Sequence, residues 1–139
     1  MGTNYYIRQK ATEQEKETLR KFNAKLPEIH VGKSSGGWSF SFHSPSREDL
    51  QNFGIAKGEV VSYAQWIDVL EETDRFELFD EYDQEVSIKT FKELVESKKD
   101  GLNHTTECLN SSREHEREHA RRSCFLDPQG HSFSTGDFS

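Results

Sequence analysis

The 139-residue sequence lacks the features that build a membrane span or a disulfide framework. No apolar run approaches the roughly 20 residues needed to cross a bilayer. The first ten residues, MGTNYYIRQK, have no apolar core of the kind found in signal peptides. Cys108 and Cys124 are the only cysteines, and two thiols do not make a disulfide framework. We therefore expect a cytoplasmic protein with reduced thiols and no membrane association.

Positive charge is also scarce in this chain. Lys and Arg number 18 against 25 Asp and Glu, so the formal net charge is −7. Binding along a phosphate backbone depends on cations that neutralise phosphates, and duplex nucleic acid is therefore disfavoured as a partner. Hydrophobic residues make up only 32% of the chain, but ten Phe raise the aromatic share to 12%. We expect one domain with a small core built from large rings.

The stretch Ile29–His43, IHVGKSSGGWSFSFH, predicts a β-hairpin at the centre of the fold. In WSFSFH, aromatic rings alternate with small polar residues, which is typical of a strand that buries one face. The Gly-rich segment KSSGG lies between two alternating runs and predicts the turn. The C-terminal segment Ser132–Phe138 repeats the Ser/Phe alternation. We expect it to pair with the hairpin, with rings inward and hydroxyls outward.

Apolar residues at helical spacing predict amphipathic helices from about residue 11 to 25, from Tyr63 and from Ile88. The expected fold is α+β, with a small mixed or antiparallel sheet that has a central Gly-rich hairpin and is covered by these helices. The segment at about 102–123 contains SSREHEREHARRS and almost no apolar residues. We expect it to form a polar helical appendage or insert on a single domain spanning residues 1–139.

Several stretches together resemble an uncharacterised family of small proteins encoded by phages and prophages. These stretches are MGTNYY, HVGKSSGGWSFSFH, the DEY at Asp80–Tyr82 and the closing GHSFSTGDFS. The resemblance covers the two ends, the hairpin and the segment around Asp80, and the family has no assigned activity. It implies a non-enzymatic binding protein in the cytoplasm of an infected or lysogenic bacterial host. Small proteins from such genomes often block host defence, so the resemblance implies an inhibitor of a host defence or host regulatory protein, or a binder of a small anionic ligand.

Two surfaces are candidates for binding. The polar side of the hairpin is rich in small hydroxyl residues that add nothing to a core, and we predict that it closes around a small anion. The residues of this predicted site are Lys33, Ser34, Ser35, His30, His43, His131 and Ser132. The alternative is the acidic stretch after residue 70, which would engage a basic host protein. Its residues are Glu77, Asp80, Glu81 and Asp83.

A zinc site is a further alternative. Cys108, His115, His119 and Cys124 form the pattern C-x6-H-x3-H-x4-C, in which the two histidines lie one helical turn apart. Against zinc, the neighbouring arginines would repel a cation and no apolar residues surround the pattern. A solvated helix with incidental histidines is the competing interpretation.

A metal-dependent hydrolase or nuclease is the alternative function, and His30, His43 and Asp137 are the residues from which its site would be drawn. No cofactor other than zinc is expected. The sequence leaves the oligomeric state open.

Overall fold

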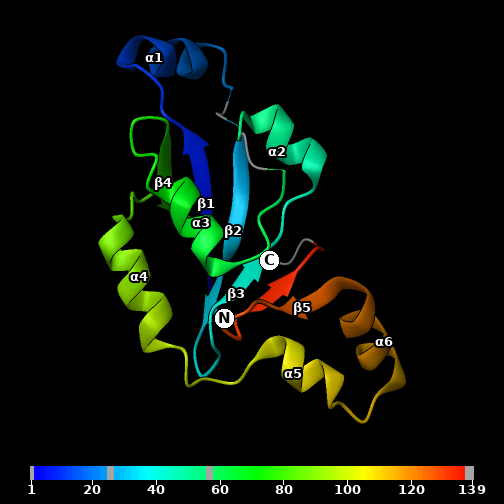
Figure 1. Ribbon diagram of the computed structural model, residues 1–139. Coiled ribbons are helices and arrows are strands. Elements are labelled where there is room, and N and C mark those ends of the chain that lie inside the picture. Colours follow the sequence, from blue (N-terminus) through cyan, green and yellow to red (C-terminus); the bar gives the residue numbers. More distant parts are fainter. Residues whose placement is uncertain (1, 25–26, 56–57, 137–139) are drawn as a thin grey trace.

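The computed structural model describes residues 2–24, 27–55 and 58–136 and shows an α+β fold around one mixed sheet (Figure 1). Within these residues the sheet has six strands, in the order β4-β1-β2-β3-β6-β5. The strands are β1 (Gly2–Gln9), β2 (Glu28–Ser35), β3 (Ser41–His43), β4 (Phe76–Asp80), β5 (Cys124–Leu126) and β6 (Ser132–Ser134). Neighbouring strands are antiparallel except β3 and β6, which run parallel. The predicted fold class is confirmed.

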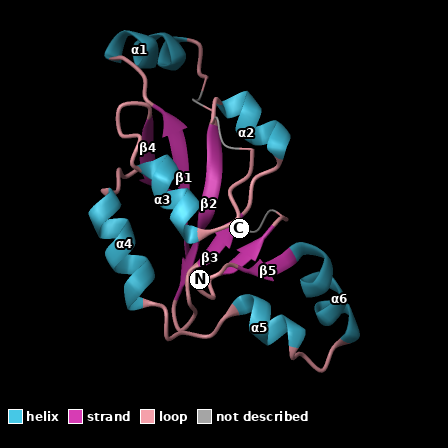
Figure 2. Cartoon of the chain, in the orientation of Figure 1, coloured by secondary structure: helices cyan, strands magenta, loops and turns pink. Residues whose placement is uncertain are grey.

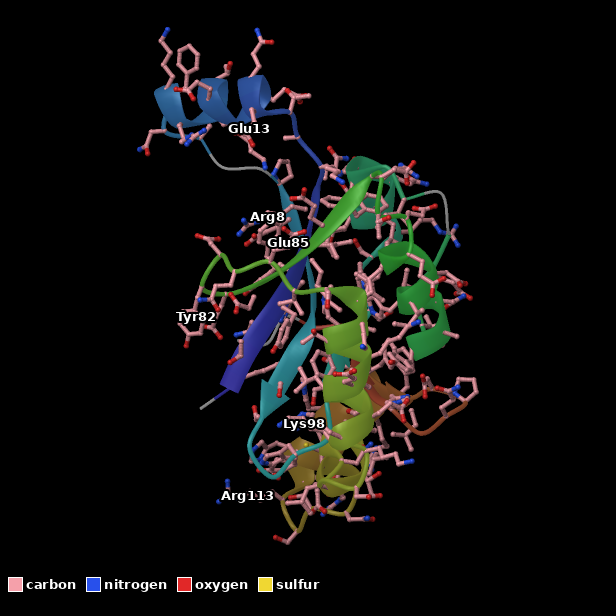
Figure 3. All side chains as sticks on the ribbon, turned by 90° about the vertical axis from the view of Figure 1, so that its left-hand side faces the viewer. Arg8, Glu13, Tyr82, Glu85, Lys98 and Arg113 are labelled. Atoms are coloured by element: carbon pink, nitrogen blue, oxygen red, sulfur yellow. The ribbon has the colours of Figure 1, made fainter. Side chains whose placement is uncertain are left out.

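Helices cover one face of the sheet and leave much of the other face open (Figures 2 and 3). The helices are α1 (Glu13–Lys21), α2 (Arg47–Phe53), α3 (Tyr63–Leu70), α4 (Ile88–Ser97), α5 (His104–Leu109) and α6 (Glu114–Ser123). α2, α3 and α4 lie on the covered face, α1 stands at one end of the sheet, and α5 and α6 lie beside β5 at the other end. In the described part of the chain, none of these helices is long and apolar enough to cross a membrane.

Serine N-caps explain why the helices of the covered face begin where they do. The hydroxyl of Ser62 accepts a hydrogen bond from the backbone N–H of Gln65, and Ser87 does the same for Thr90. Each bond satisfies a backbone donor that the first helical turn leaves without a partner. The helices predicted from Tyr63 and Ile88 therefore start at the expected residues.

Phenylalanine rings from the hairpin and the last strand form the centre of the core. The rings of Phe42 and Phe133 are stacked with their centroids 5.0 Å apart, and Phe40 lies 4.7 Å from Phe42. Phe42 is paired with Phe133 in the parallel ladder between β3 and β6. The expected pairing of the two Ser/Phe segments is therefore confirmed for Ser132–Ser134. The predicted strand is too long, since β6 ends at Ser134 and the chain bends at Thr135 and Gly136. The last two predicted residues, Asp137 and Phe138, lie outside the described residues.

The hairpin strands pair as Gly32 with Phe42 and Lys33 with Ser41, but their limits differ from the prediction. β2 continues to Ser35, so three residues of the expected turn belong to the strand. The spacing predicted that Trp38 lies on the same face as the buried rings of Phe40 and Phe42. It does not, because a contact with residue 102 interrupts the alternation. The backbone of Leu102 bonds to the carbonyl of Gly37 and to the N–H of Ser39, which holds the chain out of the strand until Ser41.

The segment 102–123 forms two helices, α5 and α6, and leads directly into β5. Most of its residues are exposed, but Thr105 and Ala120 are fully buried. The Thr105 hydroxyl lies 2.6 Å from the Ser132 hydroxyl, and the Thr105 backbone N–H donates to the same oxygen. Two positions of this polar segment are therefore buried: the Thr105 hydroxyl keeps a hydrogen-bond partner there, and Ala120 has a small apolar side chain.

Gly32 is required where the hairpin strands approach the aromatic core. A Cβ atom at this position would lie 2.3 Å from the Ser41 carbonyl oxygen and 2.4 Å from Cε1 of Phe40. We expect Gly32→Ala to lower the free energy of unfolding by about 1–3 kcal/mol, measured by urea titration. Gly36→Ala is the matched control, since a Cβ there meets nothing within 4 Å. Equal stability of the two variants would contradict this account of the hairpin.

Candidate functional site

The open face of the sheet carries a row of rings across three neighbouring strands, β1, β2 and β3. Tyr6 of β1 stacks on His30 of β2 with centroids 5.0 Å apart, and His30 stacks on His43 of β3 at 5.6 Å. Nε2 of His30 lies 3.1 Å from the carbonyl oxygen of Gly32, so this nitrogen carries the hydrogen and donates it. Nδ1 of His43 likewise donates to the His30 carbonyl at 3.1 Å. Both imidazoles are therefore held in fixed orientations by the strands themselves.

The residues of the predicted anion site do not come together as one group. Lys33, Ser35 and Ser132 line one cavity of about 340 Å³. His30 and His43 line a different cavity of about 480 Å³, together with acidic residues.

The two remaining residues of that predicted site lie elsewhere. Ser34 is buried and faces Thr3 of β1 in the ladder. His131 packs against Tyr63 at 4.8 Å and against Phe42 at 5.5 Å, which places it on the covered face. Residues two apart on an extended chain share a face, and His131 therefore follows Phe133 into the core while Ser132 and Ser134 face the open side.

The cavity that contains Lys33, called the serine cavity below, is formed by the hairpin, β6 and α5. Five serines line it: Ser35, Ser39, Ser41, Ser132 and Ser134. The ring of Trp38, from the hairpin turn, and the ring of His104, from α5, form part of the wall with their centroids 6.3 Å apart. Ser41 of β3 pairs with Ser132 of β6 in the parallel ladder, so hydroxyl groups from the two strands lie at the same level of the sheet.

Among the residues that the structure describes, the serine cavity has no acidic lining residue, although the protein as a whole is acidic. Its lining residues include Lys33 but no aspartate or glutamate, whereas each of the two other cavities described here is lined by carboxylates. Nζ of Lys98 from α4 donates to the backbone carbonyl of Ser35 at 2.8 Å, which adds a second ammonium beside the cavity. Figure 3 shows Lys98 beside the hairpin turn. Burial lowers the pKa of His104 and the charge of His119 lowers it further, so that ring is neutral at pH 7.

The hydroxyls of the serine cavity differ in their availability. Ser132 is hydrogen-bonded to Thr105, and Ser39 donates to the carbonyl of Leu102 at 3.3 Å. Within the described residues, the side chains of Ser41 and Lys33 form no such hydrogen bond or ion pair. These two groups point from adjacent strands into one cavity and are therefore available to an entering ligand.

The acidic residues of the alternative site all line a third and larger cavity of about 740 Å³. Three of them have structural partners. Asp80 Oδ1 accepts from the backbone N–H groups of Tyr82 and Gln84, and Glu81 accepts from the backbone N–H of Asn4 at 2.8 Å. Asp83 forms an ion pair with Arg8. Part of the acidic stretch therefore stabilises the turn after β4 through hydrogen bonds.

The predicted zinc ligands are not assembled as a metal site. In the described ranges, no three His, Cys, Asp or Glu side chains are grouped so that they could hold a metal ion. Sγ of Cys108 instead lies 3.8 Å from Nε2 of His104, and both cysteines are free thiols. Burial raises the pKa of each thiol and keeps it protonated. Asp137, a member of the hydrolase set, lies outside the described residues.

Sequence reasoning missed two features of the site, the wall formed by Trp38 and His104 and the contribution of α5. One local signal was present, because His104 and Cys108 are four residues apart on a helix and therefore share a face. The contact between His104 and Trp38 depends on chain segments more than sixty residues apart. No periodicity within either segment reports such a contact.

The site belongs to an α+β domain built on a mixed six-stranded sheet, with a hydroxyl-rich cavity on its open face. No protein-family model matches the chain, and neither a curated protein nor a solved structure matches it.

Proposed function

We propose that this protein binds a small anionic molecule in the serine cavity. The observation that carries the proposal is the composition of the wall: one lysine and five serines without a carboxylate, in a chain of net charge −7. Ammonium and hydroxyl groups donate hydrogen bonds to phosphate and carboxylate oxygens, and such charge-assisted bonds are stronger than neutral ones. A cavity without carboxylates in so acidic a protein favours an anion over a cation.

The size and the ring wall narrow the class of ligand. A volume of about 340 Å³ falls at the lower end of the range for small-molecule sites. Trp38 and His104 offer flat faces beside the hydroxyl groups. The expected ligand is therefore a small molecule with one phosphate or carboxylate group attached to a planar or apolar part. The resemblance to phage and prophage proteins also implies that this protein inhibits a host defence protein. That function remains a prediction, and it concerns a protein-binding surface other than the serine cavity.

Lys33→Glu is expected to weaken ligand binding by at least about tenfold, since losing a hydrogen bond to a charged group costs about 1.5–3 kcal/mol. A panel of nucleoside monophosphates, sugar phosphates and aromatic carboxylates would be screened by thermal shift, and binders would be measured by calorimetry. Lys33 is half-exposed, so the variant should melt with the parent.

Lys89→Glu is the matched control, because Lys89 is exposed in the first turn of α4 and does not line the serine cavity. It changes the net charge by the same amount and should leave binding intact. Equal loss of binding in both variants, or no binder in the panel, would overturn the proposed function.

A further inference from the structure

α1 buries little of its surface against the part of the chain that the structure describes. None of its residues is buried, although Leu19 on its apolar side is half-buried and Phe22 at its C-cap is 74% exposed. A capping box formed by Thr12 and Glu15 stabilises its first turn. A nine-residue helix is too short to be stable by propensity alone, and most helices gain their stability by burying an apolar face. The apolar side of α1 is thus available to a further element.

The largest of the three cavities is a groove between α1 and the outer surface of β1 and β4. Its volume is about 740 Å³. Figure 3 shows α1 projecting to the open side of the sheet with Arg8 below it, and α2, α3 and α4 on the opposite side. Tyr6 and Phe79 form an aromatic floor, and the Arg8 guanidinium lies 4.5 Å from the centroid of the Phe79 ring. Leu19 contributes an apolar wall from the helix.

The charge of this groove is negative. Six of its lining residues carry carboxylates and three carry cations. The cations already have acidic partners: Arg8 pairs with Glu28 and Asp83, Lys16 lies 3.8 Å from Glu13, and Arg20 lies 3.4 Å from Glu17. Glu77 has no such bond within the described residues. An excess of negative charge therefore surrounds an aromatic floor.

We propose that the α1 groove binds a basic segment of another protein that carries apolar side chains between its cationic ones. The cations would meet the carboxylates of the rim, and the apolar side chains would pack between Phe79 and Leu19. A second copy of this chain fits the groove less well, because the chain is itself acidic. Its most basic helix, α6, pairs Arg117 and Arg121 with glutamates of the same helix.

The test uses the full-length protein and a short fluorescein-labelled peptide of alternating arginine and leucine. Fluorescence anisotropy should show saturable binding that weakens as salt is added. Glu77→Lys should weaken binding by at least about tenfold, and Leu19→Gln, which keeps helix propensity but removes the apolar contact, should weaken it severalfold. Neither side chain is buried, so both variants should fold.

Glu93→Lys is the matched control, because Glu93 is exposed on α4 and does not line the groove. It should bind the peptide as the parent does, and a peptide of alternating glutamate and leucine should not bind. The proposal is overturned if the arginine peptide fails to bind, if Glu93→Lys loses as much affinity as Glu77→Lys, or if the glutamate peptide binds equally well. It is also overturned if light scattering shows a dimer that Glu77→Lys dissociates, since the groove would then hold a second copy.

Discussion

Phe42→Ala is expected to lower the free energy of unfolding by about 3–5 kcal/mol, the usual cost of removing a buried phenylalanine ring. The Phe42 side chain is fully buried, and its ring is within 5.5 Å of the rings of Phe40, Phe133 and Tyr63. It therefore joins the hairpin, the last strand and the first residue of α3. Removing the ring leaves a cavity that three separate elements would have to move together to fill. Urea titration followed by tryptophan fluorescence would measure the change.

Phe22→Ala is the control for this substitution, since Phe22 is 74% exposed at the end of α1. The same atoms are deleted, so any effect of composition or of the unfolded chain is shared by the two variants. We expect the control to change stability by no more than about 0.5 kcal/mol. Similar losses in both variants would contradict the placement of β3 at the centre of the core.

Asp127→Ala is expected to cost about 3 kcal/mol or more, because one buried carboxylate satisfies donors from two parts of the chain. Oδ2 accepts from the backbone N–H of Tyr63 at 2.8 Å, at the start of α3. Oδ1 accepts from the N–H groups of Gln129 at 2.9 Å and His131 at 2.8 Å, in the turn between β5 and β6. Alanine would leave these donors without partners inside the protein. The free energy of unfolding from urea titration is again the measurement.

Two further variants separate the hydrogen bonds of Asp127 from a general effect of removing a carboxylate. Asp127→Asn keeps one side-chain oxygen and should lose less stability than Asp127→Ala. Asp74→Ala removes an exposed carboxylate from the turn before β4 and should be close to neutral. If Asp127→Ala were also neutral, the turn between β5 and β6 would not be attached to α3 as described.

The local elements could be predicted because their causes are local. Alternating rings and hydroxyls specify which face of a strand is buried, and this pattern correctly predicted that the segments containing Phe42 and Phe133 pair. Serine caps specify helix starts through bonds that span three residues, as at Ser62 and Ser87. The α+β class follows from these elements, since apolar faces of both kinds must be buried against one another.

Only the tertiary structure decided which of these residues share a site. The parallel alignment of β6 with β3 brings Ser132 level with Ser41, whereas alternation sends His131 to the opposite face. The contact of residue 102 with the hairpin turn removes Trp38 from the strand and places it beside His104.

The acidic stretch was visible in the sequence, but the groove that it borders also needs α1, whose capping box is local and none of whose residues is buried. The sequence by itself determined the elements and their buried faces, because periodicity and capping act over a few residues. The cavities arise between segments far apart in the chain, where register and packing of the whole fold set the distances.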